Sequence, residues 1–486
     1  MGKFSFSGSS MERELAAKAG ELDALRGVRE QQLVNLTLKA IAAGVESKDA
    51  DLTAAIAASK GQRQPLIAII AREIVRVAEG RLWCAEYNEK ARSNQQMMAF
   101  VGTHWEGVKP QLWKDFVDDC ADRCGLAESY RKCHGFMNRL YENVAFCLKK
   151  FGYQSVPANQ VWLNMRNGTL EVGQDGTVRL REHRKEDYFF YTLDYAYDPE
   201  AECSQWTKFL NRVLPEGDTQ AVLAEFVGYC LMKDHRFEKM LWLYGGGQNG
   251  KSVTLDVIES LLGAGNVSYL SLSDLTTNDE RRTGIEGKLL NISHESGKDV
   301  NPSVMKQLTS GEKVTMKHLY VDHYETQNYG KFIAAFNILP RAEISAGFFR
   351  RLIILPFNET IPDEEVDRNL TFKLRQELPA ILNWVLSYLP MLMKRNAFTA
   401  SPACEKALDS YKMQSDNVKL FASEMCEASS SSVPASDVYA AYRAFCSDSA
   451  LKPLGRNKFY ERMAALGFES EVYGHERRYK LKIRQL

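Results

Sequence analysis

The sequence predicts an α/β protein whose centre is a mostly parallel β-sheet, with helical and α+β regions before it and a basic module after it. Three observations lead to this prediction. Strand-like and helix-like segments alternate from residue 240 to about residue 358, an order typical of a parallel sheet. A glycine-rich stretch follows the first of these strands. Apolar residues recur at helical spacing through most of the first 85 residues.

Length and composition set the first limits. At 486 residues the chain is long enough for about three domains. The 62 basic and 62 acidic side chains cancel, so no net charge draws the whole chain to nucleic acid or to an anionic membrane. Ten cysteines without a signal-peptide pattern indicate reduced thiols, and we expect a cytoplasmic protein. The apolar stretch ILNWVLSYLPMLM is interrupted by Asn383, Ser387 and Pro390, so we expect no membrane among the partners.

The closest cysteine cluster has two interpretations. Cys120, Cys124, Cys133 and His134 carry the ligand types that zinc prefers. However, their spacing is loose and FVDDCADRC is typical of a helix. We therefore favour buried thiols over a structural zinc site.

Changes of pattern divide the chain into five parts. Residues 1–10 lack periodicity and are expected to be a disordered terminus. Residues 11–94 are expected to form a helical module. Residues 95–204 mix helix with short strands, including a hairpin in LEVGQDGTVRL, and predict an α+β domain. Residues 205–400 begin with helices and then alternate strand and helix, and residues 401–486 follow as a separate module.

The glycine-rich stretch YGGGQNGKSVT, residues 244–254, fits the P-loop pattern. It lies between the β-rich run MLWLY and the helical pattern SVTLDVIESLLG, which is the context that a P-loop requires. In such a loop, backbone N–H groups surround phosphates, the lysine reaches the terminal phosphates and the hydroxyl binds magnesium. The residues expected to contact a nucleotide are Gly245, Gly246, Gly247, Gln248, Asn249, Gly250, Lys251, Ser252 and Val253. A chance match in a glycine loop is the alternative.

An ATPase also needs a carboxylate, a polar sensor of the γ-phosphate and usually an arginine. The strand pattern in KLLNISHESG delivers Glu295 at its carboxyl end, although this is also compatible with an ordinary strand-end glutamate. The strand FIAAF ends in Asn337, which suits a sensor, although asparagines are also common in turns. In FFRRLIILPF, Arg350 and Arg351 are either a solvated pair or a source of positive charge for a neighbouring subunit's nucleotide.

Together, GGGQNGKS, NISHES, LTSGEKVTMKHLY, AAFNILP and FFRRLIILPF resemble the superfamily 3 helicase domain of the phage, plasmid and poxvirus primase-helicase group. The phrases VWLNMRNGTLEV and LREHRKEDYFFYTLDYAYDP resemble the domain that precedes the helicase in that group. The resemblance implies an AAA+ P-loop ATPase core and a hexameric ring that tracks along single-stranded DNA. It also implies ATP and Mg²⁺ as cofactors and a prokaryotic host cell.

The resemblance assigns the first catalytic roles by position. Lys251 and Ser252 correspond to the Walker A lysine and a magnesium ligand, and Glu295 corresponds to the Walker B acid, the second magnesium ligand. Many members have two adjacent acids there, whereas His294 precedes Glu295 in this chain. Coordination and water activation therefore rest on one carboxylate.

The remaining roles follow in the same way. Asn337 falls at the family's sensor and Arg351 at its arginine finger, with Arg350 as the close alternative. Lys317 and His318 lie in the region of the family's DNA-contacting hairpin. Their alternating stretch suits a hairpin that grips the phosphate backbone, but an exposed surface strand would have the same pattern.

The C-terminal segment is locally basic. Residues 452–486 contain nine Lys or Arg and four Glu. Two helical patterns and a β-rich end resemble the winged-helix module that follows the motor in related helicases, and the serine-rich segment 427–437 is the best linker candidate before it. Either this end binds origin DNA or it is a solvated basic tail. The candidate DNA-binding residues are Arg456, Lys458, Arg462, Arg477, Arg478 and Lys480.

The leading hypothesis is an ATP-driven DNA helicase or replication initiator of a phage, plasmid or integrated mobile element. Nothing before residue 240 shows a zinc ribbon or the paired aspartates of a polymerising enzyme, so a separate primase is an expected partner. A second hypothesis is an origin-binding or regulatory protein that uses ATP only to set its assembly state. A third is a P-loop phosphotransferase acting on a small molecule, which the basic terminal module argues against.

Overall fold

The computed structural model describes residues 30–45, 50–59, 61–86, 95–148, 156–157, 159–294, 300–317, 323–340, 346–448, 453–473 and 476–484. The expected disordered terminus at residues 1–10 lies outside these ranges. The chain divides into two compact units. The first comprises Met1–Glu202, Glu259–Asn266 and Leu378–Lys394, and the second comprises Cys203–Ile258, Val267–Glu377 and Arg395–Leu486.

A single hydrophobic core organises the N-terminal part of the first unit. It runs from Val34 to Leu148 and therefore crosses the boundary that we expected after residue 94. The expected helical module also contains a strand, because Leu82 and Cys84 turn into this core while their strand pairs with the next one. The elements are helices at residues 30–42, Ala50–Ala58 (α2), Arg63–Ala78 (α3), Pro110–Arg123 (α4), Glu128–Arg131 (α5) and His134–Cys147 (α6), with antiparallel strands Leu82–Glu86 (β1), Gln95–Phe100 (β2) and Trp105–Gly107 (β3).

A second antiparallel sheet follows, with strands Gln160–Met165 (β4), Gly168–Gly173 (β5) and Val178–Arg181 (β6). The hairpin predicted in LEVGQDGTVRL is confirmed as β5 and β6.

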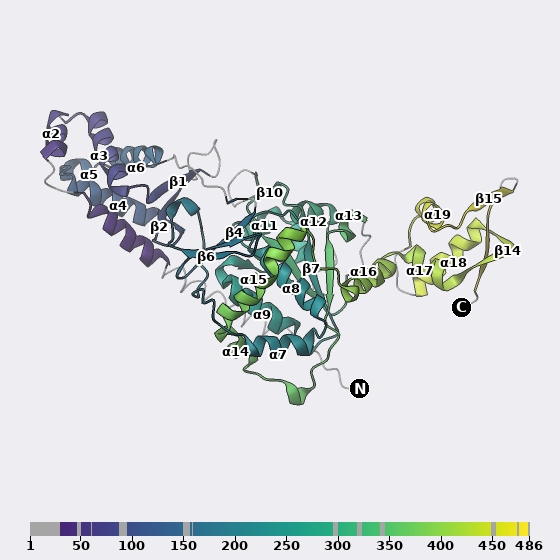
Figure 1. The fold of residues 1–486 in the computed structure, drawn as a ribbon. Helices are drawn as coiled ribbons and strands as arrows, with labels where there is room; N and C mark the ends of the chain where they lie inside the picture. Colours follow the sequence, from purple (N-terminus) through teal and green to yellow (C-terminus); the bar gives the residue numbers. More distant parts are fainter. Residues whose placement is uncertain are drawn as a thin grey trace, which may run out of the picture. The chain divides into compact units, whose positions relative to one another are not determined.

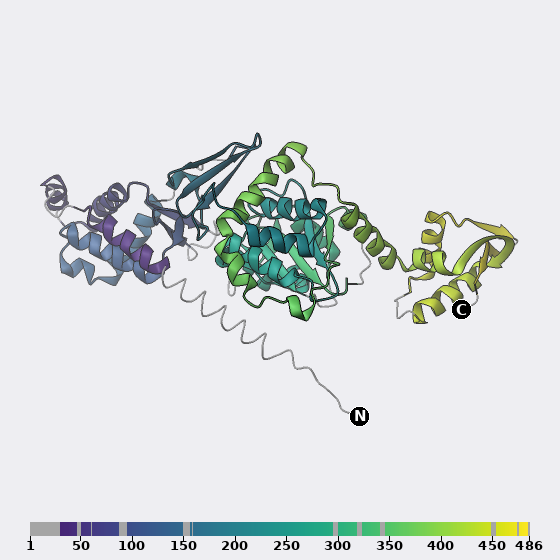
Figure 2. The ribbon, with the colours of Figure 1, turned by 60° about the horizontal axis from the view of Figure 1, so that its bottom comes forward.

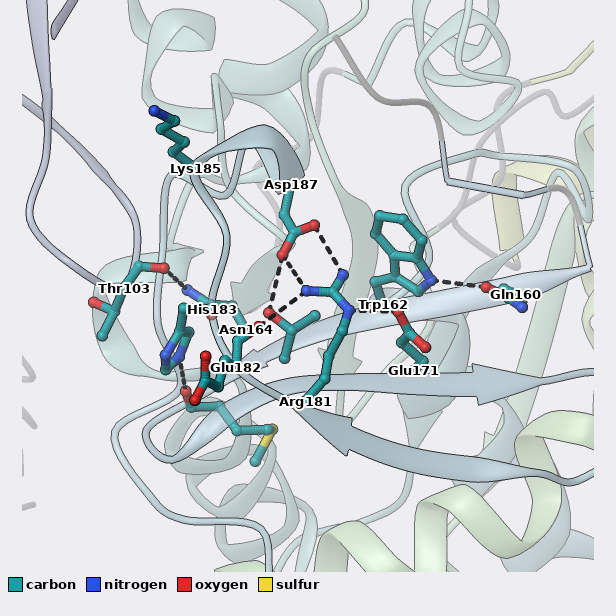
Figure 3. A network of polar contacts seen from close by, with 12 residues as sticks. Thr103, Gln160, Trp162, Asn164, Glu171, Arg181, Glu182, His183, Lys185 and Asp187 are labelled. Carbon is teal, nitrogen blue, oxygen red and sulfur yellow. Dashed lines mark hydrogen bonds and ion pairs between the residues drawn. The ribbon is translucent and has the colours of Figure 1, made fainter. Parts of the chain in front are cut away.

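A buried ion-pair network fastens this sheet to the segment after it (Figure 3). Arg181 donates two hydrogen bonds to the Asp187 carboxylate, at 2.7 and 2.8 Å, and one to Glu171 at 2.5 Å. Thr169 donates to Asp187 as well, and the guanidinium lies 5.0 Å from the centroid of the Trp162 ring. Because each charge has its partner inside the network, we assign it to architecture rather than to chemistry.

The second unit holds the predicted parallel sheet, which the structure confirms (Figure 1). Its order is β13-β7-β12-β9-β8, and all four pairings are parallel. The strands are Met240–Tyr244 (β7), Val267–Ser268 (β8), Leu290–His294 (β9), Lys331–Phe336 (β12) and Leu352–Pro356 (β13). The helices are Ser204–Val213 (α7), Gly217–Cys230 (α8), Lys251–Leu262 (α9), Leu272–Thr277 (α10), Asp279–Arg282 (α11), Pro302–Thr309 (α12), Ala346–Phe349 (α13) and Leu370–Gln376 (α14).

Connections on this sheet reverse direction between two neighbouring strands. The connection after β7 leads to β8 at one edge of the sheet, whereas the connection after β12 passes β7 to reach β13 at the other edge. Right-handed crossovers place these two connections on opposite faces. The connections therefore reverse at the carboxyl ends of β7 and β12, and sheets of this kind bind ligands in the crevice at such a point.

Apolar side chains on one face of the sheet fix the surrounding helices. Trp242, Ala334 and Ile354 share a core with Leu275 of α10 and Met305 of α12. The same core extends to the region of β10, Val314–Met316, which pairs antiparallel with β11, Tyr324–Thr326. This two-stranded hairpin lies where LTSGEKVTMKHLY predicts one.

Three helices and a small sheet form the C-terminal module, drawn in yellow-green and yellow (Figures 1 and 2). They are Asn417–Met425 (α17), Ala435–Asp448 (α18) and Arg456–Ala465 (α19), with strands Cys426–Pro434 (β14), Ser470–Tyr473 (β15) and Glu476–Ile483 (β16). The helix before them, Pro402–Ser415 (α16), instead shares the core of the parallel sheet through Tyr411. The prediction of a linker at 427–437 is wrong, because β14 occupies most of that segment. β14 is held by backbone hydrogen bonds to β16, which any side chain permits. The serine-rich composition therefore gave no sign of a strand.

The apolar stretch near residue 385 lies in helix Leu378–Arg395 (α15), which contains Pro390. Among the helices of the described ranges, none is long and apolar enough to cross a membrane. Cys120 and Cys124 are buried in the N-terminal core, and burial raises the pKa of both thiols, that of Cys124 to about 12. Within the described part of the chain, no group of three or more His, Cys, Asp or Glu is arranged to hold a metal.

Candidate functional site

The glycine loop leaves β7 at the crevice and turns sharply before α9. Gly247, Gln248 and Gly250 have φ angles of 107°, 46° and 84°, in the left-handed region that glycine adopts most easily. A Cβ atom added at Gly246 or Gly247 would meet nothing within 4 Å. The backbone in the middle of the loop is therefore open to a ligand.

Contacts with the ends of two other strands hold the loop in place. The Gly245 N–H donates to Phe336 O at 3.2 Å, and the Asn249 amide donates to Phe357 O at 3.1 Å. A side chain at Gly245 would collide with the Asn249 amide and with Phe357 O. Ile361 N donates to Gln248 O at 2.7 Å. The loop is thus preorganised at the carboxyl edge of the sheet.

Lys251 begins α9 and is only 7% exposed. Its Nζ donates to Gly245 O at 2.7 Å, to Asn249 Oδ1 at 3.0 Å and to Asn337 Oδ1 at 3.1 Å. Asn337 follows β12 and is exposed. The fold therefore brings the predicted lysine and the predicted sensor, 86 residues apart in sequence, into direct contact.

The first turn of α9 carries the other loop residues. Ser252 is exposed and Val253 is half-buried. The helix N-terminus adds a partial positive charge, which favours an anion. His294 ends β9 and is exposed, while Glu295 lies outside the described residues.

The arginine pair lies at the opposite edge of the sheet. β13 and β7 run parallel and pair from Leu352↔Met240 to Pro356↔Tyr244. Arg351 lies just before the amino end of β13, whereas the glycine loop follows the carboxyl end of β7. Met240 N donates to Arg351 O at 2.8 Å. Within one chain, the sheet therefore separates the arginines from Lys251.

The two arginines differ in environment. Arg351 is 8% exposed and its guanidinium contacts Ser310, Gly347 and Glu238. The Arg350 side chain is 67% exposed, and its nearest carboxylate is also that of Glu238, at 3.5 Å.

The base of the β10–β11 hairpin lies at this same edge. Gly311 has a φ angle of 69°, and a Cβ added there would lie 2.7 Å from His235. His235 shares a hydrogen bond of 3.0 Å with Gly330 O. Burial lowers the pKa of His235 to about 4, and burial lowers that of Lys331 to about 8. Both side chains belong to the packing below the hairpin.

Lys317 follows β10, and its side chain is 39% exposed. Its backbone N–H donates to Asp279 O at 3.2 Å, and its Nζ lies 3.8 Å from Glu280. Arg282 also anchors the hairpin, because it donates to Thr315 O at 2.7 Å. His318, the second predicted DNA contact, lies outside the described residues.

The predicted basic residues of the C-terminal module fall into two groups. Arg456, Lys458 and Arg477 are exposed. The guanidinium groups of Arg456 and Arg477 each lie 5.4 Å from a ring centroid, that of Tyr439 and Tyr460 respectively.

The second group has internal partners. Arg462 pairs with Asp416, Lys480 lies 2.5 Å from Glu471, and Arg478 donates to Ser432 at 3.0 Å.

Sequence reasoning missed Glu238 and Ser310, which hold Arg351. Glu238 precedes the first strand of the sheet and lies in none of the quoted stretches. Ser310 follows α12 and lies within LTSGEKVTMKHLY, where sequence reasoning gave roles only to Lys317 and His318. The one available signal is the backbone of Glu238, whose φ of 48° is rare for a residue other than glycine.

Three family models match successive parts of the chain. A model described as D5 N terminal like matches residues 80–215, a Family of unknown function (DUF5906) matches residues 243–351, and one described as Poxvirus D5 protein-like matches residues 413–480. The middle match covers both the glycine loop and the arginine pair.

Viral proteins are among the similar sequences. A protein of African swine fever virus, named provisionally as a primase, is 24% identical over 197 residues, which cover 38% of this chain and 20% of that protein. A protein of invertebrate iridescent virus 3, named provisionally as a helicase, is 23% identical over 263 residues, or 47% of this chain and 28% of the relative. The matches thus span between a fifth and just over a quarter of these relatives.

Among solved structures, the apo C-terminal region of NrS-1 aligns with 85% of this chain and 98% of its own, at 11% identity and a TM-score of 0.45. The family models on both sides of the glycine loop and the viral relatives agree on one assignment. These matches support a phage- and poxvirus-type primase-helicase family for this chain.

Proposed function

We propose that this chain is an ATP-dependent DNA helicase or replication initiator of a phage, plasmid or integrated mobile element, and that it acts as a hexameric ring on single-stranded DNA. The observation that carries the proposal is the 3.1 Å contact between Lys251 Nζ and Asn337 Oδ1 beside the glycine loop. A lysine and an amide at one point of a sheet edge are the pair that a triphosphate site needs.

The topology supports an AAA+ P-loop core. The contact lies at the crevice between β7 and β12, where the connections reverse. The loop before α9 offers open backbone at Gly246 and Gly247. These features fit a nucleotide whose phosphates rest on the N-terminus of α9.

The residues divide the chemistry as follows. Loop N–H groups bind the phosphate oxygens, and Lys251 exchanges part of its present hydrogen bonding for the terminal phosphates. Asn337 orients the attacking water or the γ-phosphate, and Glu295 accepts the proton from that water. The exposed hydroxyl of Ser252 and the Glu295 carboxylate suit Mg²⁺, which supplies charge neutralisation when bound.

The position of the arginine pair supports assembly. β13 and β7 put five residues between the arginines and the glycine loop, roughly 17 Å of strand. The arginines are therefore placed to serve the nucleotide of a neighbouring copy rather than their own. A head-to-tail contact of this kind closes into a ring when its rotation permits.

Two surfaces are proposed to bind DNA. Lys317, with His318, would contact the single strand from the β10–β11 hairpin. In the C-terminal module, α18 and α19 followed by β15 and β16 suit a winged helix that binds origin DNA. Its exposed cations are Arg456, Lys458 and Arg477.

The test is steady-state ATP hydrolysis with and without single-stranded DNA, together with strand displacement from a forked duplex. The wild-type protein should show DNA-stimulated hydrolysis and displacement. Lys251→Ala should lose both, because it removes the ammonium group proposed to bind the terminal phosphates. Lys132→Ala is the matched control, since its side chain is 76% exposed just after α5 and should leave both activities intact. Substantial unwinding by Lys251→Ala would refute the assignment.

The same experiment separates the alternatives. DNA binding with nucleotide-dependent assembly but no displacement would indicate the ATP-regulated origin-binding protein. Hydrolysis or transfer that is indifferent to DNA and requires a small acceptor would indicate a phosphotransferase.

A further inference from the structure

The two adjacent arginines cannot play the same part, because their surroundings differ. Arg351 is buried and has a partner on each side of its guanidinium. Its Nε donates to Ser310 Oγ at 2.9 Å, its Nη1 donates to Gly347 O at 2.8 Å, and its Nη2 lies 2.9 Å from Glu238 Oε2. Withdrawing it would leave Gly347 O and Ser310 Oγ without this donor, and Glu238 with only its 3.5 Å contact to Arg350, so the change costs stability.

Arg350 has the opposite character. Its side chain is 67% exposed, and its distance of 3.5 Å to Glu238 is that of a loose surface pair. Its backbone, in contrast, is fixed, because Lys239 Nζ donates to Arg350 O. Lys239 lies close to both arginines. Its pKa is lowered, first by burial and then by the positive charges of Arg350 and Arg351. An exposed guanidinium on a hydrogen-bonded backbone is suited to reach a group outside its own chain.

Ser310 connects this cluster to the hairpin. It caps the C-terminal end of α12, four residues before β10 begins at Val314. The neighbouring Gly311 packs on His235, and Gly311 O accepts from Gln327 Nε2 at 3.2 Å, just after β11. A displacement of the hairpin base therefore changes the position of the Ser310 hydroxyl, and with it the hydrogen bond to Arg351.

From this geometry we infer that Arg350 is the residue offered to the nucleotide of a neighbouring copy, and that Arg351 is a positioning residue that ties Arg350 to the base of the β10–β11 hairpin. This rests on the proposed function and deepens it. Glu238 joins the two arginines, since one carboxylate oxygen faces both. The state of a neighbour's nucleotide and the position of the hairpin are then coupled through two adjacent residues.

The first test compares Arg350→Ala with Arg351→Ala. Arg350→Ala should keep the wild-type melting temperature and nucleotide affinity while turnover falls about a thousandfold, as for arginine fingers elsewhere. Arg351→Ala should lower the melting temperature, because it removes the donor to Gly347 O and Ser310 Oγ and the 2.9 Å ion pair with Glu238. Full turnover in Arg350→Ala, or loss of turnover in Arg351→Ala at an unchanged melting temperature, would overturn the assignment.

The second test isolates the coupling to the hairpin. Ser310→Ala removes one hydroxyl and should lower the ratio of DNA-stimulated to basal turnover severalfold. Arg351→Lys should do the same, because an ammonium cannot replace the planar fork of three contacts. Ser303→Ala is the control, since Ser303 is exposed on the same helix. An unchanged ratio in both Ser310→Ala and Arg351→Lys would exclude the tie.

Failure of this inference is distinguishable from failure of the proposed function. If the wild-type protein neither hydrolyses ATP nor assembles, the proposed function fails. If the wild-type protein does both and Arg350→Ala is unaffected, only the division of labour between the arginines fails.

Discussion

At the scale of single residues, Gly245 and Gly246 are neighbours in the glycine loop but tolerate a side chain differently. A Cβ at Gly245 collides with Phe357 O and the Asn249 amide, while a Cβ at Gly246 enters open space. Gly245 is thus required by the protein itself, whereas the space at Gly246 is where a ligand would lie.

We predict that Gly245→Ala destabilises the protein by about 1–3 kcal/mol, the usual cost of overpacking, because backbone must shift to admit the methyl group. Gly246→Ala should leave the melting temperature unchanged. Thermal unfolding without nucleotide measures both. Equal melting temperatures for the two variants would contradict the tight approach of Gly245 to Phe357 O.

At the scale of elements, the C-terminal module separates basic residues that the sequence alone treats as equal. Arg462 and Lys480 face carboxylates of their own module, whereas Arg456, Lys458 and Arg477 face solvent. A cation that already has a carboxylate partner gains less from a phosphate, so the exposed group should dominate DNA binding.

The prediction for this module concerns salt dependence. Arg456→Ala, Lys458→Ala and Arg477→Ala should each weaken duplex binding and reduce the slope of log K against log salt by about 1. Lys480→Ala and Arg462→Ala are the controls and should change the slope less. Fluorescence anisotropy at several salt concentrations provides the measurement. Equal slope changes in all five variants would show that the ion pairs of Arg462 and Lys480 do not reduce the contribution of these two residues to DNA binding.

At the scale of the whole molecule, the sheet places Lys251 and Arg350 at opposite edges, so under the proposed function a single chain would lack a complete site. Hydrolysis per chain should therefore rise with protein concentration as copies assemble. Specific activity measured across the range in which sedimentation shows assembly tests this expectation. Activity proportional to chain number down to the monomer would contradict it.

Mixing two inactive variants gives a sharper result. Lys251→Ala keeps Arg350, and Arg350→Ala keeps Lys251, so a mixed ring contains some complete boundaries. Equal amounts should restore about a quarter of wild-type hydrolysis if boundaries act independently in a head-to-tail ring. Each variant mixed with itself is the control.

Much of the central site is predictable from sequence because its signals are local. The glycine pattern, the apolar strand before it and the amide at the end of β12 each occupy a few consecutive residues. The rule that parallel strands gather ligands at their carboxyl ends then predicts that Lys251 and Asn337 meet. In the structure, Lys251 Nζ lies 3.1 Å from Asn337 Oδ1.

Other features depended on contacts between distant segments. Whether a serine-rich stretch pairs as a strand depends on its partner, β16, and the N-terminal core joins residues on both sides of an expected boundary. A sequence pattern read over a few consecutive residues contains no information about the pairing of β14 with β16 or about the extent of the N-terminal core.

By itself, the sequence determined the parallel sheet, the glycine loop and the family, because each is written in residues that are close together along the chain. Only the tertiary structure decided the difference between Arg350 and Arg351. Burial and hydrogen bonding are set by Glu238 and Ser310, far away in sequence, and two identical neighbouring side chains differ only through such partners.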